Sequence, residues 1–130
     1  MDTGRALPAI LVVEDDVQFR RYLAELLDSE GFAVRLAENG VAALALLAEV
    51  TVDVVLTDLV MPDQDGVSLI RALRRQYPAL HIVAMSGRGR TDLSMDSLGL
   101  VRLLGADQTL EKPFSVEELR QALAAGLTRH

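Results

Sequence analysis

The sequence predicts an α/β protein, a three-layer sandwich in which helices cover both faces of a five-stranded parallel sheet. Apolar strand-like runs alternate with helix-like patterns along the chain, and no linker, repeat or low-complexity segment interrupts them. The chain has 130 residues, half of them hydrophobic, which suits one domain with one sizeable core. We therefore expect residues 1–130 to form a single domain with its core at about 8–127.

The first half of the chain contains three predicted strands and two predicted helices. Residues 9–13 form a continuous apolar run, typical of a strand buried on both faces. Asp15 or Asp16 can cap the helix that follows, and Gly31 is a suitable residue just beyond its end. The predicted elements are strands at 9–13, 32–36 and 53–57, a helix between Asp16 and Gly31, and a helix capped by Asn39 that continues to about residue 49.

The second half contains two predicted strands and three predicted helices. A helix at 67–76 ends before Pro78, and the arginines of its last turn suit the negative end of the helix dipole. Ser115 and Glu118 form a capping box, which opens the last helix. The predicted elements are strands at 80–85 and 108–110 and helices at 67–76, at 91–104 and from Ser115 onward.

Charge and residue content exclude several classes of function. The formal net charge is −6, and an acidic surface repels nucleic acid, so we expect no direct nucleic-acid binding. The chain has no cysteine, which excludes disulfides and thiolate metal sites and is compatible with the cytoplasm. The longest uninterrupted apolar run, at 41–48, is too short to cross a bilayer. We therefore expect a cytoplasmic protein without a membrane span.

Candidate functional residues follow the predicted strands. Glu14 and Asp15 come directly after the first strand, Asp58 after the third, Ser86 after the fourth and Lys112 after the fifth. In an open parallel sheet, ligands bind at the carboxyl ends of the strands, so these side chains should converge. Crowded carboxylates repel one another, and a hard cation such as Mg²⁺ relieves the repulsion. Carboxylates, a metal, a hydroxyl and a lysine together indicate phosphoryl-transfer chemistry.

Four segments, in this order along the chain, give the sequence its resemblance to a known family. They are Ile10-Leu-Val-Val-Glu-Asp-Asp16, Asp58-Leu-Val-Met-Pro-Asp-Gln-Asp-Gly66, Ser86-Gly87 and Lys112-Pro-Phe114. Together they resemble the receiver domain of bacterial two-component response regulators, of the stand-alone, chemotaxis-regulator-like kind. The resemblance implies a flavodoxin-like (βα)5 fold with strand order 2-1-3-4-5. It also implies phosphorylation by a histidine kinase or histidine phosphotransfer protein, and a signal passed to an unnamed downstream partner. Activity as an enzyme would be limited to self-phosphorylation and autodephosphorylation.

The resemblance also implies a role for each site residue. Asp58 is the phospho-acceptor, and Lys112 and Ser86 contact the phosphoryl oxygens. The Lys112–Pro113 peptide bond is expected to be cis. The ligands expected for Mg²⁺, or for Mn²⁺ in its place, are Asp15 directly, Glu14 through a water, Asp58 and the backbone carbonyl of Val60.

Two departures from the family pattern affect the expected switch. The family usually has an aromatic residue three positions before the lysine, coupled to the hydroxyl residue at Ser86, whereas this chain has Thr109 there. The segment between Ser86 and Lys112 is longer than usual, which predicts a longer loop at 87–97. We expect Arg88 or Arg90 of this loop to contact the phosphoryl group or the kinase.

Other functions are compatible with the same residues. A phosphorelay intermediate would pass the phosphoryl group to another protein, and the missing aromatic residue favours this alternative. A receiver fragment of a larger regulator would act through the rest of that chain. A Mg²⁺-dependent phosphatase would turn over small phosphoesters, and an inert receiver-shaped module would only bind a partner.

Several polar residues are predicted to have ordinary structural roles. Asp16 is expected to cap a helix, and residues 63–66 to form a turn and a helix start. The arginines of the helix at 67–76 are interpreted as a solvated face, and His81 as a residue without a catalytic role.

Overall fold

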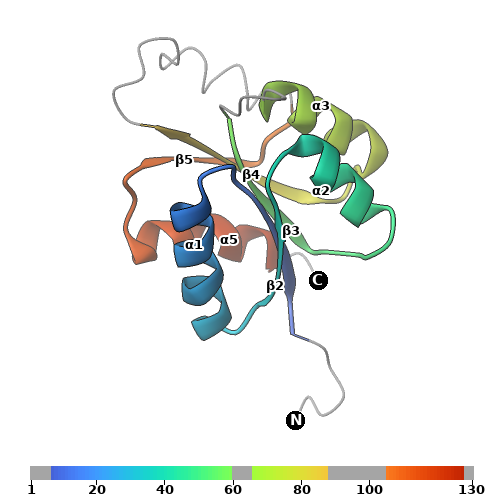
Figure 1. Ribbon diagram of the computed structural model, residues 1–130. Coiled ribbons are helices and arrows are strands. Elements are labelled where there is room, and N and C mark those ends of the chain that lie inside the picture. The colour runs from blue at the N-terminus through green and yellow to red at the C-terminus, as the bar shows by residue number, and fades with distance from the viewer. Residues whose placement is uncertain (1–6, 60–65, 88–104, 128–130) are drawn as a thin grey trace.

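The computed structural model describes residues 7–59, 66–87 and 105–127, and its central feature is a five-stranded sheet (Figure 1). All strand pairs are parallel, and the order across the sheet is β2-β1-β3-β4-β5, which confirms the predicted sheet. The strands are β1 (Ala9–Val13), β2 (Ala33–Ala37), β3 (Val54–Asp58), β4 (His81–Gly87) and β5 (Gln108–Lys112).

Helices cover both faces of this sheet. Within the described ranges, α1 and α5 lie on one face and α2 and α3 on the other (Figure 1). They are α1 (Val17–Ser29), α2 (Gly40–Leu47), α3 (Gly66–Gln76) and α5 (Val116–Leu127). The helix predicted at 91–104 lies outside the described residues. None of the helices described here has the length and apolar character needed to cross a membrane.

Two hydrophobic cores follow from the alternation of side chains along each strand. Leu11 and Val13 pack toward α2 and α3, whereas Ile10 and Val12 pack toward α1 and α5. The fully buried leucine and isoleucine residues that complete the cores from the helices are Leu23 and Leu27 of α1, Leu69, Ile70 and Leu73 of α3, and Leu119 of α5. The same alternation decides which face of the sheet each residue at a strand end joins.

The predicted helix caps are present. The Asp16 carboxylate accepts a hydrogen bond from the Gln18 N–H (3.1 Å), and it caps α1. Ser115 and Glu118 bond each other's backbone N–H groups at 2.8 and 3.0 Å, which forms the capping box before α5. Gly31 has a φ of 95° just beyond α1, a conformation that glycine adopts without strain. These helix ends are therefore fixed by hydrogen bonds and backbone conformations of residues that are close together in the sequence.

Three strands extend further than the sequence predicted. β3, β4 and β5 reach Asp58, Gly87 and Lys112, whereas the predicted ends were at 57, 85 and 110. Pairing continues because ladder hydrogen bonds join backbone groups whatever the side chain: Asp58 pairs with Met85, and Gly87 pairs with Lys112. The polar residues at these ends are thus fixed on the sheet rather than on loops. The Lys112–Pro113 peptide bond that follows is cis, as predicted.

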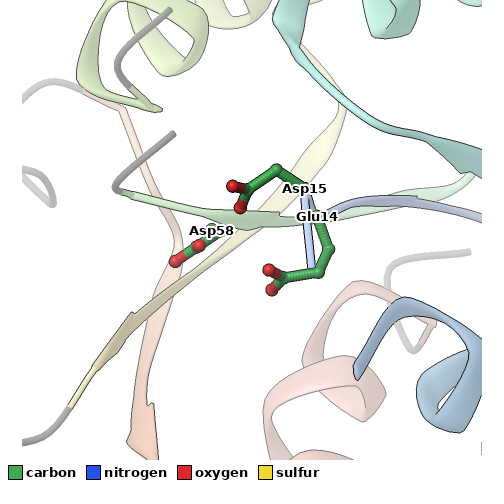
Figure 2. A group of neighbouring side chains, drawn as sticks. All are labelled: Glu14, Asp15 and Asp58. Carbon is green, nitrogen blue, oxygen red and sulfur yellow. The ribbon is translucent and has the colours of Figure 1, made fainter. Parts of the chain in front are cut away.

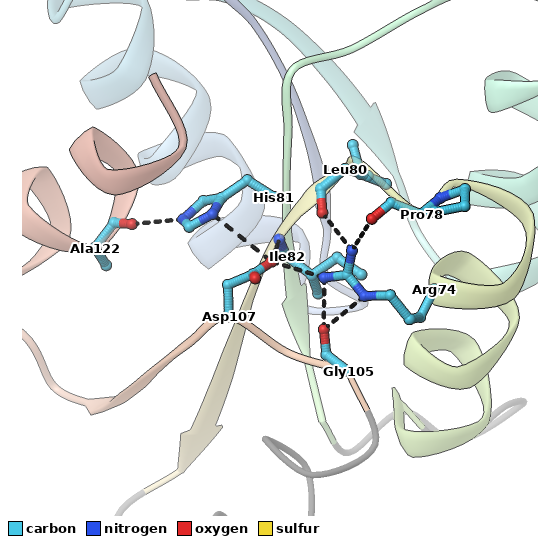
Figure 3. Close-up of polar contacts among 8 residues, drawn as sticks. All are labelled: Arg74, Pro78, Leu80, His81, Ile82, Gly105, Asp107 and Ala122. Atoms are coloured by element: carbon cyan, nitrogen blue, oxygen red, sulfur yellow. Dashed lines mark hydrogen bonds and ion pairs between the residues drawn. The ribbon is translucent and has the colours of Figure 1, made fainter. Parts of the chain in front are cut away.

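Arg74 near the end of α3 has a structural role that the sequence interpretation missed (Figure 3). Its guanidinium donates to the carbonyl oxygens of Gly105 (2.6 and 3.0 Å), Pro78 (2.7 Å) and Leu80 (2.9 Å). It also pairs with the Asp107 carboxylate at 2.7 Å. Interpretation of this arginine as part of a solvated face was therefore wrong. Arg74 ties α3 to the segments that lead into β4 and β5.

His81, the first residue of β4, is buried beside the same ion pair (Figure 3). Its Nε2 lies 2.9 Å from the carbonyl oxygen of Ala122 in α5, so Nε2 donates this hydrogen bond. Its Nδ1 lies 3.7 Å from an Asp107 carboxylate oxygen. The imidazole ring lies against Gly126, where a side chain would overlap it. His81 therefore joins β4 to α5 at the end of the sheet opposite the predicted site.

Candidate functional site

Three carboxylates converge where β1 and β3 end, at the carboxyl end of the sheet (Figure 2). Glu14 and Asp15 directly follow β1, and Asp58 ends β3. These two strands are neighbours, and Val13 pairs with Thr57, so the next positions lie side by side. One oxygen from each carboxylate lies within 4.8 Å of the other two. The structure therefore brings together the acidic residues that the strand ends indicated.

Lys112 reaches the same cluster from the end of β5. Its Nζ lies 3.0 Å from Oε1 of Glu14 and 3.6 Å from Oδ1 of Asp58. β5 is separated from β3 by β4, so the long lysine side chain spans a strand to reach the carboxylates. The site thus contains one ammonium group close to two carboxylates, one directly after β1 and one at the end of β3.

The cluster contains three carboxylates and one ammonium group, so negative charge is in excess. Glu14 is 1% exposed and Asp58 is 6% exposed. Burial raises the pKa of Glu14 above its usual range, and the Asp58 carboxylate raises it further. The hydrogen bond and charge of Lys112 lower this pKa in part. Carboxylate oxygens are the ligands of hard divalent cations, and such a cation would offset the remaining repulsion, so these residues fit Mg²⁺.

Backbone and side-chain hydrogen bonds hold Glu14 in place. Its Oε2 accepts from the Asp16 N–H at 3.1 Å, and its backbone carbonyl accepts from Nη1 of Arg20 at 2.7 Å. On the neighbouring strand, the buried Thr57 hydroxyl donates to the Asp58 carbonyl at 3.0 Å. Sequence reasoning missed Arg20, because the sequence does not distinguish an arginine near the start of a helix that makes such a contact from one that points into solvent.

An aromatic side chain of α1 lies beside the lysine. The Lys112 Nζ is 4.6 Å from the ring centroid of Phe19. That ring makes an edge contact with Phe114 at 6.1 Å and stacks on Tyr22 at 6.0 Å. The sequence gave no signal of this contact, because Phe19 and Lys112 are far apart along the chain.

The structure places the two predicted switch residues on adjacent strands. Ser86 is 3% exposed and lies one position beyond Met85, which pairs with Asp58. Thr109 is half-buried in β5 and pairs with Ala84. Both residues are therefore held in the sheet, and Ser86 is next to the residue that pairs with Asp58.

Three predicted site residues lie outside the described residues. They are Val60, whose carbonyl is the expected metal ligand, and Arg88 and Arg90 of the segment 87–97. The roles suggested for these residues by the sequence stay predictions. The described part of the site is the cluster of Glu14, Asp15, Asp58 and Lys112, with Ser86 nearby.

Known sequences that match this chain include response regulators. The family model described as "Response regulator receiver domain" matches residues 10–124. The transcriptional regulatory protein CpxR of Klebsiella pneumoniae is 40% identical over 121 residues, covering 92% of this chain and 49% of that protein. The KDP operon transcriptional regulatory protein KdpE of Escherichia coli is 36% identical, covering 93% and 52%. This chain spans about half the length of the curated relatives it matches.

Solved structures show the same architecture. A response regulator receiver domain protein from Clostridium thermocellum matches with a TM-score of 0.86 and 29% identity, covering 95% of this chain and 96% of that chain. The receiver domain of NtrX from Brucella abortus matches with a TM-score of 0.85 and 29% identity, covering 93% and 99%. A sensor protein from Polaromonas sp. matches with a TM-score of 0.79 and 36% identity, covering 92% and 95%.

Proposed function

This chain belongs to the response regulator receiver domain family, and from that premise we propose that Asp58 accepts a phosphoryl group in the presence of Mg²⁺ and that a partner protein reads the phosphorylated state. The donor would be a histidine kinase or a histidine phosphotransfer protein. The observation that carries the proposal is the convergence of three carboxylates and one lysine at the carboxyl end of the sheet. The proposal concerns the receiver function of this chain alone.

The proposed chemical step needs a carboxylate nucleophile and charge stabilisation, both of which the site supplies. A carboxylate oxygen of Asp58 attacks the phosphorus in line with the bond to the donor. That bond breaks, and its electron pair leaves with the donor nitrogen, which gives an acyl phosphate on Asp58. Lys112 would stabilise the transferred oxygens, and its distance of 3.6 Å from Asp58 Oδ1 supports this role. Attack by water on the phosphorus, with Asp58 leaving as carboxylate, would reset the site.

The hydrogen bonds of Glu14 suggest that Asp15 and Glu14 would bind the metal in different ways, one directly and one through a water. Both Glu14 oxygens already accept hydrogen bonds, Oε1 from Lys112 and Oε2 from the Asp16 N–H. Asp15 is the exposed member of the carboxylate cluster, so it is the better direct ligand, together with Asp58. Glu14 would then act through a water. When bound, Mg²⁺ supplies positive charge that offsets the carboxylates and the incoming phosphoryl oxygens.

Intact mass measurement tests the proposed acceptor. We expect the wild-type chain, incubated with acetyl phosphate and Mg²⁺, to gain the mass of one phosphoryl group, and Asp58→Ala to gain none. Chelation of Mg²⁺ should prevent the gain. Asp16→Asn is a matched control, because Asp16 caps α1 and Asn retains that hydrogen bond, so labelling should persist. An unmodified wild type, or equal labelling of Asp58→Ala, would overturn the proposal.

A phosphorelay intermediate is the second candidate, and Thr109 favours it. Thr109 is half-buried in β5, at the position where the resemblance leads us to expect an aromatic side chain coupled to Ser86. Threonine has no ring that could rotate in response to the hydroxyl residue. Phosphorylated chain mixed with a histidine phosphotransfer protein would distinguish the two functions. Rapid loss of the phosphoryl group from Asp58 to the added protein supports the relay, whereas retention on Asp58 supports a switch.

A further inference from the structure

The ammonium group of Lys112 is held from two sides by groups of different character. Glu14 Oε1 accepts its hydrogen bond at 3.0 Å, and the ring of Phe19 lies 4.6 Å away. An aromatic face attracts a cation through its quadrupole, and the attraction strengthens when the cation is partly shielded from water. The Lys112 side chain is 23% exposed, so the contact lies between the exposed and the fully shielded case.

The orientation of the Phe19 ring is itself fixed by neighbours. Phe114, two residues beyond Lys112, meets the ring edge-on with an interplanar angle of 68°. Tyr22, one helical turn further along α1, stacks on it with an interplanar angle of 21°. Aromatic pairs with these geometries are favourable beyond their buried area. The orientation of the ring is therefore fixed from α1 and from the segment directly after β5, the strand that ends with the lysine.

The alternation of side chains explains why this helix meets this lysine. Glu14, Asp58 and Lys112 stand two positions after Val12, Leu56 and Leu110, all of which pack toward α1 and α5. Phe19 packs against the same core from α1. The lysine, its carboxylate partners and the aromatic ring are thus on one face of the sheet.

We propose that Phe19 is a positioning residue that holds the Lys112 ammonium beside Asp58; this proposal rests on the proposed phosphoryl-acceptor function. A carboxylate alone would keep Lys112 in an ion pair with Glu14. The ring adds an attraction that does not neutralise the charge and does not depend on Glu14. Lys112 can therefore change its partner from Glu14 to a phosphoryl oxygen at Asp58 while it remains on the ring.

Two substitutions at Phe19 distinguish the effect of the aromatic face from the effect of the volume of the side chain. Phe19→Leu keeps an apolar side chain but removes the aromatic face, and Phe19→Tyr keeps the face. We expect the rate of Asp58 labelling by acetyl phosphate to fall about fivefold in Phe19→Leu, the size expected for a partly shielded cation–ring contact. Phe19→Tyr should restore most of the rate. Phe32→Leu is the matched control, because this buried phenylalanine packs in the same core and lines a groove with Leu27 and Leu119, and its labelling rate should match the wild type.

A double-mutant cycle tests whether Phe19 acts through the lysine. In a Lys112→Ala background, Phe19→Leu should slow labelling no further. A proton NMR measurement tests the geometry without any reaction. The ε-methylene protons of Lys112 should be shifted upfield by the ring current in the wild type and in Phe19→Tyr, and this shift should disappear in Phe19→Leu.

Each result has a definite meaning. Labelling of Phe19→Leu at the wild-type rate overturns the positioning role while leaving Asp58 as the acceptor. An equal further loss in the Lys112→Ala background also overturns it, because the effect would then be a general one on the fold. Absence of the upfield shift in the wild type contradicts the cation–ring contact. A wild type that is not labelled at all overturns the acceptor function and this inference together.

Discussion

Gly66 is the first residue of α3, and replacement by alanine should disturb both the fold and the site. A Cβ atom at this position would overlap the carbonyl oxygen of Asp58 and lie 2.6 Å from Cα and 2.8 Å from the carbonyl oxygen of Leu59. All of these atoms belong to the backbone of the strand end that carries Asp58. No side chain can rotate away to make room, so the helix and the strand must separate.

The size of the effect follows from these distances. Ordinary contacts between such atoms are about 3.5–4.0 Å, so a gap of 2.6 Å must open by roughly 1 Å. Overpacking of this kind costs about 1–3 kcal/mol, and weakening the 2.8 Å hydrogen bond from the Gly66 N–H to Leu59 adds about 1 kcal/mol. Helix propensity returns at most about 1 kcal/mol. We expect a net loss of about 1–3 kcal/mol, which lowers Tm by about 5–10 °C.

Urea unfolding followed by circular dichroism measures this loss, because the chain has no tryptophan. Leu73→Ala is the control for stability alone: Leu73 is fully buried in α3, and its truncation costs about 2–5 kcal/mol without touching the Asp58 backbone. At a temperature where both variants are folded, Gly66→Ala should label more slowly at Asp58 than Leu73→Ala. A Gly66→Ala variant as stable as the wild type, or labelled as fast as Leu73→Ala, would refute the reasoning.

Two further predictions concern residues remote from the acidic cluster. A Cβ at Gly126 would lie 2.6 Å from both Cβ and Cδ2 of the buried His81 side chain, so Gly126→Ala should destabilise the protein by about 2 kcal/mol in urea unfolding despite its gain in helix propensity. The same change in a His81→Ala background should be neutral or stabilising, and an equal loss there would contradict the contact. The hydrogen bond from Arg120 holds the pKa of Glu30 below its usual range. Its stabilising effect is therefore present above the unfolded-state pKa and lost as the pH falls through the folded-state pKa, so the Tm difference between wild type and Arg120→Ala should close on acidification. A difference that persists unchanged at low pH would argue against this pair.

Much of the fold and the position of the site could be predicted, because both depend on short-range patterns and on topology. A capping box or an Asp before a helix needs only neighbouring residues, and Asp16 and Ser115 act as expected. Continuous apolar runs define buried strands, and parallel strands present their carboxyl ends at one edge of the sheet. Residues directly after such runs, Glu14 and Asp58 above all, could therefore be expected to meet.

Contacts that depend on tertiary placement could not be predicted in the same way. Arg71, Arg74 and Arg75 look equivalent in the sequence, and only the positions of the Gly105 carbonyl and the Asp107 carboxylate select Arg74. Strand ends were placed too early for a related reason. A polar side chain suggests a loop, but the backbone beneath it keeps pairing as long as its neighbour does.

The stacking of Tyr22 on Phe19 has a consequence for optical spectroscopy. With no tryptophan in the chain, phenol emission is not lost by energy transfer to an indole, and Tyr22 and Tyr77 are the only tyrosines. Tyr22 touches the ring beneath Lys112, whereas Tyr77 follows α3 near the start of β4, at the far end of the sheet. The unlabelled chain thus carries one intrinsic fluorophore next to the ring that contacts Lys112 and a second that serves as an internal reference, and Tyr22→Phe would separate their signals.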